Sequence, residues 1–230
     1  MLPSYYPLVF GIIFFLSHYI GDKIHSNHRP KILLLSVGIS LAYIFLYLMP
    51  EAITFNLNSA KLLPGFMLLG IMLSRVSEMH IRRHRSLLTI KKELKNIHSI
   101  ALFAYNLIVG MLIIEFSKIG IAAALLFFLP ALFHSAAGSI SISGIHKSVT
   151  ESAPMKILLS SSTLFGIFIA GSLSLSAPLF GAMLGLTIGV MLYSVMRDAV
   201  PWENMKNAQY FILGILLYAL AIEASMLFLV

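Results

Sequence analysis

The sequence lacks cysteine and has little charge. None of its 230 residues is a cysteine, which excludes a disulfide framework, a thiolate metal site and a cysteine nucleophile. Only 11% of the residues are charged, against about 25% in a typical soluble domain, and 59% are apolar. These figures exclude a water-soluble enzyme, a zinc-finger protein and a disordered chain, and they predict that the protein lies in a lipid bilayer.

Long apolar segments are abundant instead. A transmembrane helix needs about 20 mainly apolar residues. The first segment has neither a basic start nor a small-residue cleavage site, so we expect it to be retained rather than removed as a signal peptide. The sequence predicts an all-α integral membrane protein with a single transmembrane domain over residues 1–230 and a basic cytoplasmic loop at 80–96. The eight expected membrane segments are 4–20, 31–49, 62–79, 97–114, 119–143, 157–175, 178–196 and 208–230.

Most of the 16 lysines and arginines lie on one side of these segments. Only Lys61 and Lys118 lie in connections on the other side, and Arg75 lies within the third segment. Because basic loops stay in the cytoplasm, we expect both termini to lie outside the cytoplasm, in a plasma membrane or a bacterial inner membrane. Membrane topology explains the net charge of +7 better than nucleic-acid binding does. The residues on the basic side are Lys23, Arg29, Lys31, Arg82, Arg83, Arg85, Lys91, Lys92, Lys95, Lys147, Lys156, Arg197 and Lys206.

A glycine-to-proline pattern occurs in two segments that run in opposite directions. Gly38 leads to Pro50 in the second segment, and Gly189 leads to Pro201 in the seventh, with the same spacing. Inverted repeats are typical of transporters, which bind their substrate near the membrane midplane between the repeats. The alternative is coincidence, because glycine and proline are common in membrane helices.

The segments that follow these two also resemble each other, around Gly70 in the third and Gly214 in the eighth. The sequence therefore predicts an inverted repeat of segments one to three and six to eight around segments four and five.

Few polar side chains lie deep in the expected membrane core. Asn106 lies about 14 Å into the fourth segment at 1.5 Å per residue, close to the midplane. In the fifth segment Pro130 can free a backbone carbonyl, and His134 and Ser135 follow it. An amide and an imidazole are ordinary ligands of a divalent cation, but both also serve as hydrogen-bonding groups between membrane helices. A ligand role and a packing role therefore both stay open.

Other residues can belong to a polar path. His98 and Tyr105 form a stripe beside Asn106 on the fourth segment. Glu51 and Glu78 lie near segment ends, where carboxylates reach water, and they are the plausible acidic groups to turn toward the midplane.

Three stretches carry a more specific pattern: Gly38 to Ala52, Gly70 to Arg85, and Gly189 to Pro201 leading into Leu213 and Gly214. In these stretches the chain resembles the ZIP (Zrt/Irt-like) family of divalent-metal permeases. The resemblance covers most of the chain. It implies eight spans with both termini outside, and a transport site between spans four and five. In the family this site is built from a His-Asn-x-x-Asp/Glu-Gly motif and a His-Glu-x-Pro-Glu-like motif.

The chain departs from both motifs. On the first it keeps Asn106 and the glycine that follows, but Tyr105 replaces the histidine and Val109 replaces the carboxylate. On the second it keeps His134, while Ser135 and Gly138 stand where the family has acidic residues. The resemblance thus implies Asn106, His134 and Ser135 as metal ligands and Tyr105, Val109 and Gly138 as lost positions. Because these ligands supply no counter-charge, we expect a weak or altered site.

Two functions follow from these observations. One is a ZIP-like transporter of a divalent cation such as zinc, iron or manganese, carried as substrate, with no cofactor. The other is a degenerate relative that no longer transports metal, serves an interaction or regulatory role as a homodimer, or carries another substrate. An enzyme is not expected, because no His-Glu-x-x-His motif is present and both aspartates, Asp22 and Asp198, lie at segment ends.

Overall fold

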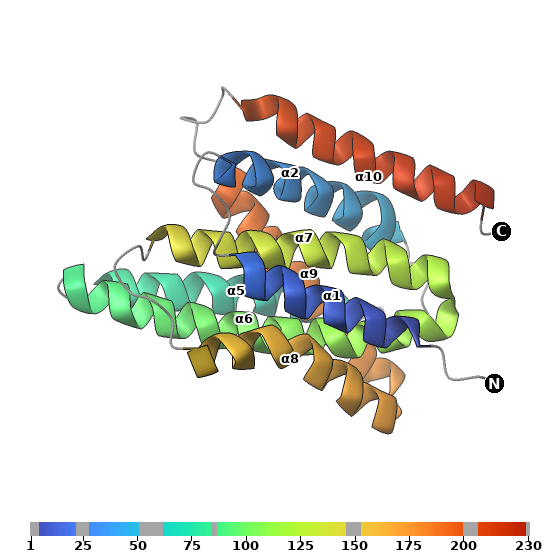
Figure 1. The fold of residues 1–230 in the computed structure, drawn as a ribbon, viewed down its shortest axis with the longest axis horizontal. Helices are drawn as coiled ribbons and strands as arrows, with labels where there is room; N and C mark the ends of the chain where they lie inside the picture. Colours follow the sequence, from blue (N-terminus) through green and yellow to red (C-terminus); the bar gives the residue numbers. More distant parts are fainter. Residues whose placement is uncertain are drawn as a thin grey trace.

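The protein is a bundle of long helices. The computed structural model describes residues 5–21, 28–50, 62–83, 87–145, 153–199 and 207–228 (Figure 1). Regular structure in these ranges is helical throughout, and α1 begins at the end of the bundle where α10 finishes. The elements are α1 (Tyr6–Gly21), α2 (Arg29–Ala42), the π-helix η1 (Tyr43–Leu48), α5 (Leu62–Arg83), α6 (Leu87–Ile119), α7 (Ile121–Ile145), α8 (Ala153–Ser172), α9 (Ala177–Ala199) and α10 (Ala208–Phe228).

The helices follow the apolar segments that the sequence shows. In the described ranges each predicted segment lies on one helix, with η1 continuing α2 through the second segment. Helices α5 and α6 extend beyond the predicted segments into the connection expected at 80–96, since α5 continues to Arg83 and α6 begins at Leu87. Leucine, lysine and glutamate are good helix formers in water as well as in lipid, so the helices extend past their apolar stretches.

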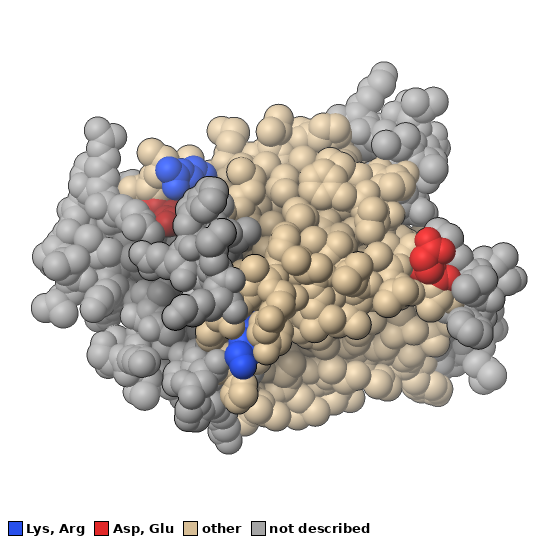
Figure 2. All heavy atoms as spheres, turned by 90° about the horizontal axis from the view of Figure 1, so that it is seen from above, with Lys and Arg blue, Asp and Glu red and all other residues tan. Residues whose placement is uncertain are grey.

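Membrane-type helices dominate the described ranges. Four segments are long and apolar enough to cross a membrane, and the apolar parts of α1, α5, α7 and α8 are shorter. Large apolar side chains such as Phe168 and Leu220 point outward. Figure 2 shows a broad face without charge, with the visible charged side chains toward its two ends. These features indicate a membrane location. The four long segments are Pro30–Leu48, Ser99–Ile119, Ala177–Arg197 and Ala208–Ser225.

Four helices form the centre of the bundle. Helix α2 packs on α7 and α9, and α6 packs on the same two helices, so the four close a ring that we call the inner bundle. Helix α10 covers α2, α5 covers α9, and α8 covers α6. Helix α1 packs on α7 and α8. The inner bundle is therefore enclosed by the remaining helices.

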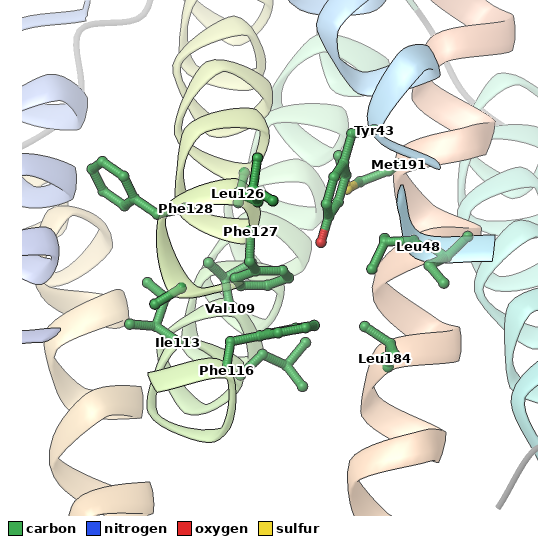
Figure 3. Close-up of a cluster of buried hydrophobic side chains, with 14 of the residues drawn as sticks. Tyr43, Leu48, Val109, Ile113, Phe116, Leu126, Phe127, Phe128, Leu184 and Met191 are labelled. Atoms are coloured by element: carbon green, nitrogen blue, oxygen red, sulfur yellow. The ribbon is translucent and has the colours of Figure 1, made fainter. Parts of the chain in front are cut away.

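Large side chains fill the inner bundle. Phe116 of α6 stacks on Phe127 of α7 with ring centroids 4.7 Å apart. Tyr43 of η1 meets the edge of Phe127 at 6.1 Å, and Leu184 and Met191 of α9 lie on the opposite side of this cluster (Figure 3). Lipid tails are as apolar as these side chains, so close packing rather than transfer from water holds such a centre together.

Helices α2 and α10 cross at a pair of glycines. A Cβ atom added to Gly38 would lie 2.2 Å from the Phe211 carbonyl oxygen, and one added to Gly214 would lie 2.4 Å from that of Leu35. Real Cβ atoms essentially never come this close to another heavy atom. Only glycine therefore lets the two backbones touch.

Helices α5 and α9 cross in the same way. A Cβ atom at Gly70 would lie 2.7 Å from the Leu186 carbonyl oxygen, and one at Gly189 would lie 2.1 Å from that of Met67. Two glycines that lie in similar sequence motifs therefore do not contact each other. Gly38 resembles Gly189 but contacts Gly214, and Gly189 contacts Gly70.

A third crossing joins α6 to α8. A Cβ atom at Gly110 would lie 2.1 Å from the Thr163 carbonyl oxygen, and one at Gly166 would lie 2.0 Å from that of Leu107. Small residues that bring backbones together are the usual means of packing helices in membranes. We call these three contacts the glycine crossings.

Pro130 interrupts the hydrogen bonding of α7 within the bundle. Proline has no N–H group, so the carbonyl of the residue four positions earlier, Leu126, loses its helical partner. The Tyr218 hydroxyl of α10 donates a hydrogen bond to that carbonyl at 2.7 Å. A side chain from the far end of the sequence thus satisfies the carbonyl that the proline frees.

Candidate functional site

Tyr105 and His134 come together between α6 and α7. Their ring centroids are 5.1 Å apart with the planes tilted by 56°. Tyr105 is buried, and His134 is partly buried. The side chain that meets the imidazole is therefore the tyrosine at the altered motif position, one residue before Asn106.

Asn106 is buried and has an available acceptor. Only 2% of the residue is exposed, and its Oδ1 atom has no hydrogen-bond partner among the described residues. It lies one turn before Gly110, on the side of α6 that approaches α8. A buried carbonyl oxygen without a partner is costly, and it is also free to serve as a ligand.

Val109 lies where the resemblance implies a carboxylate. It is fully buried in the apolar cluster of the inner bundle, close to Phe127 and Ile113 (Figure 3). Among the described residues no aspartate, glutamate, lysine or arginine is buried. The centre of the molecule is therefore electrically neutral wherever the structure describes it.

Ser135 and Glu78 are placed differently. Ser135 is 1% exposed on α7 beside His134. The carboxylate of Glu78 accepts a hydrogen bond of 2.5 Å from the Tyr193 hydroxyl, and this bond ties α5 to α9. Glu78 is partly buried and is thus held by another helix rather than directed at Asn106.

Three further candidates cannot be placed. Glu51 lies outside the described residues, as do the side chain of His98 on α6 and the surroundings of Gly138 on α7. Within the residues that are described, no three His, Asp or Glu side chains gather in a group that could hold a metal ion.

The structure adds Tyr43, Tyr47 and Tyr218 to Tyr105, the one tyrosine that sequence reasoning singled out for a polar path. Tyr43 meets Tyr47 at 5.9 Å and Tyr218 at 5.6 Å between ring centroids. The hydroxyls of Tyr43 and Tyr105 are buried and have no hydrogen-bond partner among the described residues. In the sequence these tyrosines look like ordinary membrane aromatics. Their spacing carries no signal, because they come from three separate helices.

No protein-family model matches this chain, and no characterised protein matches its sequence.

Proposed function

We propose that the protein is a ZIP-like membrane transporter of divalent metal cations with an altered, carboxylate-poor transport site between α6 and α7. All eight helices cross the membrane in this proposal. The units α1–α2–α5 and α8–α9–α10 form an inverted repeat around α6 and α7. No cofactor takes part, and the metal ion is the substrate.

The observation that carries the proposal is that helices of the first unit pack against helices of the second unit. If α2 corresponds to α9 and α5 to α10, a two-fold axis turns the contact of α2 with α10 into the contact of α9 with α5. Both contacts exist, and each is made by two glycines. The same axis turns the packing of α2 on α7 into that of α9 on α6, which also exists. Such an arrangement is typical of inverted-repeat transporters.

The polar residues near the centre support a transport site of low charge. Asn106 offers a buried carbonyl oxygen on the side of α6 that approaches α8, and His134 of α7 contacts the neighbouring Tyr105. Neutral ligands offset only part of the dehydration of a doubly charged ion, so binding is weak and release is easy.

Cationic side chains support the proposed orientation. Lys31 at the start of α2 lies over the Tyr210 ring at 5.4 Å, and Lys156 near the start of α8 lies over the Tyr19 ring at 4.7 Å. These starts follow basic connections, which supports a cytoplasmic location for that end of the bundle, with both termini on the other side of a plasma or bacterial inner membrane.

The complete burial of Val109 in an apolar cluster favours a second candidate. A packed valine at a ligand position fits a relative that has lost metal transport and acts as a regulatory or interacting membrane protein, for example as a homodimer. The two candidates differ in whether the purified protein moves metal.

Uptake into proteoliposomes tests the proposal. Purified protein is assayed with zinc, iron and manganese, alongside Asn106→Ala and His134→Ala. His28→Ala serves as a matched control, because this imidazole is exposed just before α2. The proposal expects saturable uptake that both site variants reduce at least about tenfold, the effect of roughly 1.4 kcal/mol, and that the control retains. Absence of uptake of every metal would refute it and support the second candidate.

A further inference from the structure

Arg75 lies on the outward face of α5 among apolar side chains. It is three positions after Met72 and four before Met79, so the three side chains share one face of the helix. Met72 is 59% exposed and Met79 51%, and Arg75 is exposed as well. In a bilayer this face meets lipid. A charge on such a face is costly unless an anionic partner lies within its reach.

The depth of Arg75 determines what the lipid offers it. The apolar part of α5 runs from Leu62 to Val76, so Arg75 lies at its end. The helix continues to Arg83, and only residues 84–86 separate it from the start of α6. Figure 1 shows α6 and α8 beginning at the same end of the bundle. Where the apolar part ends, hydrocarbon gives way to headgroups, and the anion of a headgroup is its phosphate.

Polar contacts to α9 hold the Arg75 side chain in place. The Tyr193 side chain of α9 hydrogen-bonds with both Arg75 and Glu78 of α5. Its hydroxyl donates to the Glu78 carboxylate at 2.5 Å, so the guanidinium is the donor to the hydroxyl oxygen. The two helices also touch at Gly70 and Gly189, which fixes their spacing. The guanidinium is therefore ordered before any ligand arrives, which lowers the entropic cost of binding.

The charge and the donors of this region favour an anion. A guanidinium has more N–H donors than one tyrosine oxygen can accept, so donors remain for a second acceptor. Arg197 lies four positions after Tyr193, on the same side of α9, and is partly buried. Two arginines and the Glu78 carboxylate leave one positive charge in excess. Guanidinium groups match the oxygens of a phosphate in a bidentate geometry.

We propose that Arg75, held by Tyr193 and Glu78 where α5 meets α9, binds the phosphate group of an anionic phospholipid. The acyl chains of this lipid lie along the apolar face of α5 that carries Met72. The site goes beyond the proposed transport, because it involves neither a metal ion nor Asn106 and His134. It requires only that the protein lies in a membrane.

Thermal unfolding of the full-length protein tests this site. The protein is washed free of native lipid in a mild detergent with a chelator present, and phosphatidylglycerol, phosphatidylcholine or inorganic phosphate is then added. A ligand that binds only the folded state raises the melting temperature in a saturable manner. We expect phosphatidylglycerol to do so. Phosphatidylcholine should do so much less, because its ammonium group offsets its phosphate, and inorganic phosphate should not, because it has no acyl chains.

Two variants make the test specific. Arg75→Gln removes the charge and should lower the affinity for phosphatidylglycerol about tenfold. Lys156→Gln is the matched control, because it removes one positive charge at the same end of the bundle from α8, which packs on α6 and α1. It should leave the affinity nearly unchanged, since distant exposed charges are screened. If Arg75→Gln unfolds too readily to compare, retention of radioactive phosphatidylglycerol in the cold by each variant tests the same expectation.

Several results would overturn this site. Equal stabilisation by the two phospholipids, or equal affinity of the native chain and Arg75→Gln, would remove it. Equal weakening by both substitutions would mean that diffuse charge attracts the lipid, and equal stabilisation by inorganic phosphate would mean a soluble ligand.

The two proposals can fail separately. Stabilisation by phosphatidylglycerol without metal uptake would remove the metal substrate and leave the lipid site. Metal uptake without any effect of Arg75→Gln on lipid binding would leave the transporter and remove this site.

Discussion

At the glycine crossings backbone meets backbone, whereas in the inner bundle aromatic rings hold the helices apart. At Gly110 an added Cβ atom would lie 2.1 Å from a carbonyl oxygen of α8, so the crossing has no room for another atom. In the inner bundle, Tyr43 and Tyr105 are just as deeply buried, yet their hydroxyls have no partners among the described residues. The crossings thus have no room for another atom, whereas the inner bundle contains buried hydroxyls without partners among the described residues. The carrier proposed above would have rigid units that move around a centre that exchanges partners.

The largest expected effect comes from placing a charge in the inner bundle. Val109→Asp buries a carboxylate at a position with no exposure, so we expect a loss of about 3 kcal/mol or more in unfolding free energy. Unfolding of the purified protein in mixed detergent and SDS measures it. Val109→Thr, which adds only a hydroxyl, should lose less, about 1–2 kcal/mol. Equal losses for both variants would mean that water reaches this position.

The next effect tests the crossings. Gly110→Ala forces α6 and α8 apart, and overpacking of this kind costs about 2–3 kcal/mol. Gly171 on α8 has nothing within 4 Å of an added Cβ, so Gly171→Ala should be neutral or stabilise by up to about 1 kcal/mol. The same unfolding assay compares the two. If both alanines behaved alike, the close approach of α6 and α8 would be contradicted.

A smaller effect concerns the link between α7 and α10. Tyr218→Phe leaves the Leu126 carbonyl without a donor and should cost about 1–2 kcal/mol. Pro130→Ala restores the helical N–H group to that carbonyl, so the same tyrosine change should cost close to nothing in the alanine background. A double-mutant cycle measures this coupling. Additive losses would show that the hydroxyl does not replace the missing helical bond.

The smallest effect lies at the helix ends. Lys156→Gln removes the cation from the Tyr19 ring of α1 and should cost about 0.5 kcal/mol. In a Tyr19→Leu background the lysine change should cost less still, because no ring remains to attract the cation. A loss as large as that at Gly110 would place a major packing contact at this end rather than at the crossings.

Much of the secondary structure follows from the sequence alone. The apolar segments predict every helix of the described ranges, because twenty consecutive apolar residues have few other stable conformations in lipid. In the connection expected at 80–96, helix propensity extends α5 and α6 beyond their apolar parts.

The candidate site is predicted less completely. Sequence spacing brings Asn106 and His134 to similar depths, but the contact to His134 comes from Tyr105. The sequence also shows that Gly38 resembles Gly189, and it does not show that Gly38 contacts Gly214. Similarity between two motifs indicates equivalent positions in two units. It does not indicate which helices touch, because touching depends on how the units are placed.

Composition and local periodicity are enough to predict that this protein lies in lipid, where its helices are, and that its described centre is electrically neutral. The tertiary fold is needed to show that Tyr218 satisfies the carbonyl freed by Pro130 and that the hydroxyls of Tyr43 and Tyr105 stay without partners among the described residues. The two kinds of information differ because every helix satisfies most of its own backbone locally. Whether each remaining polar atom has a hydrogen-bond partner depends on which distant helix packs against it.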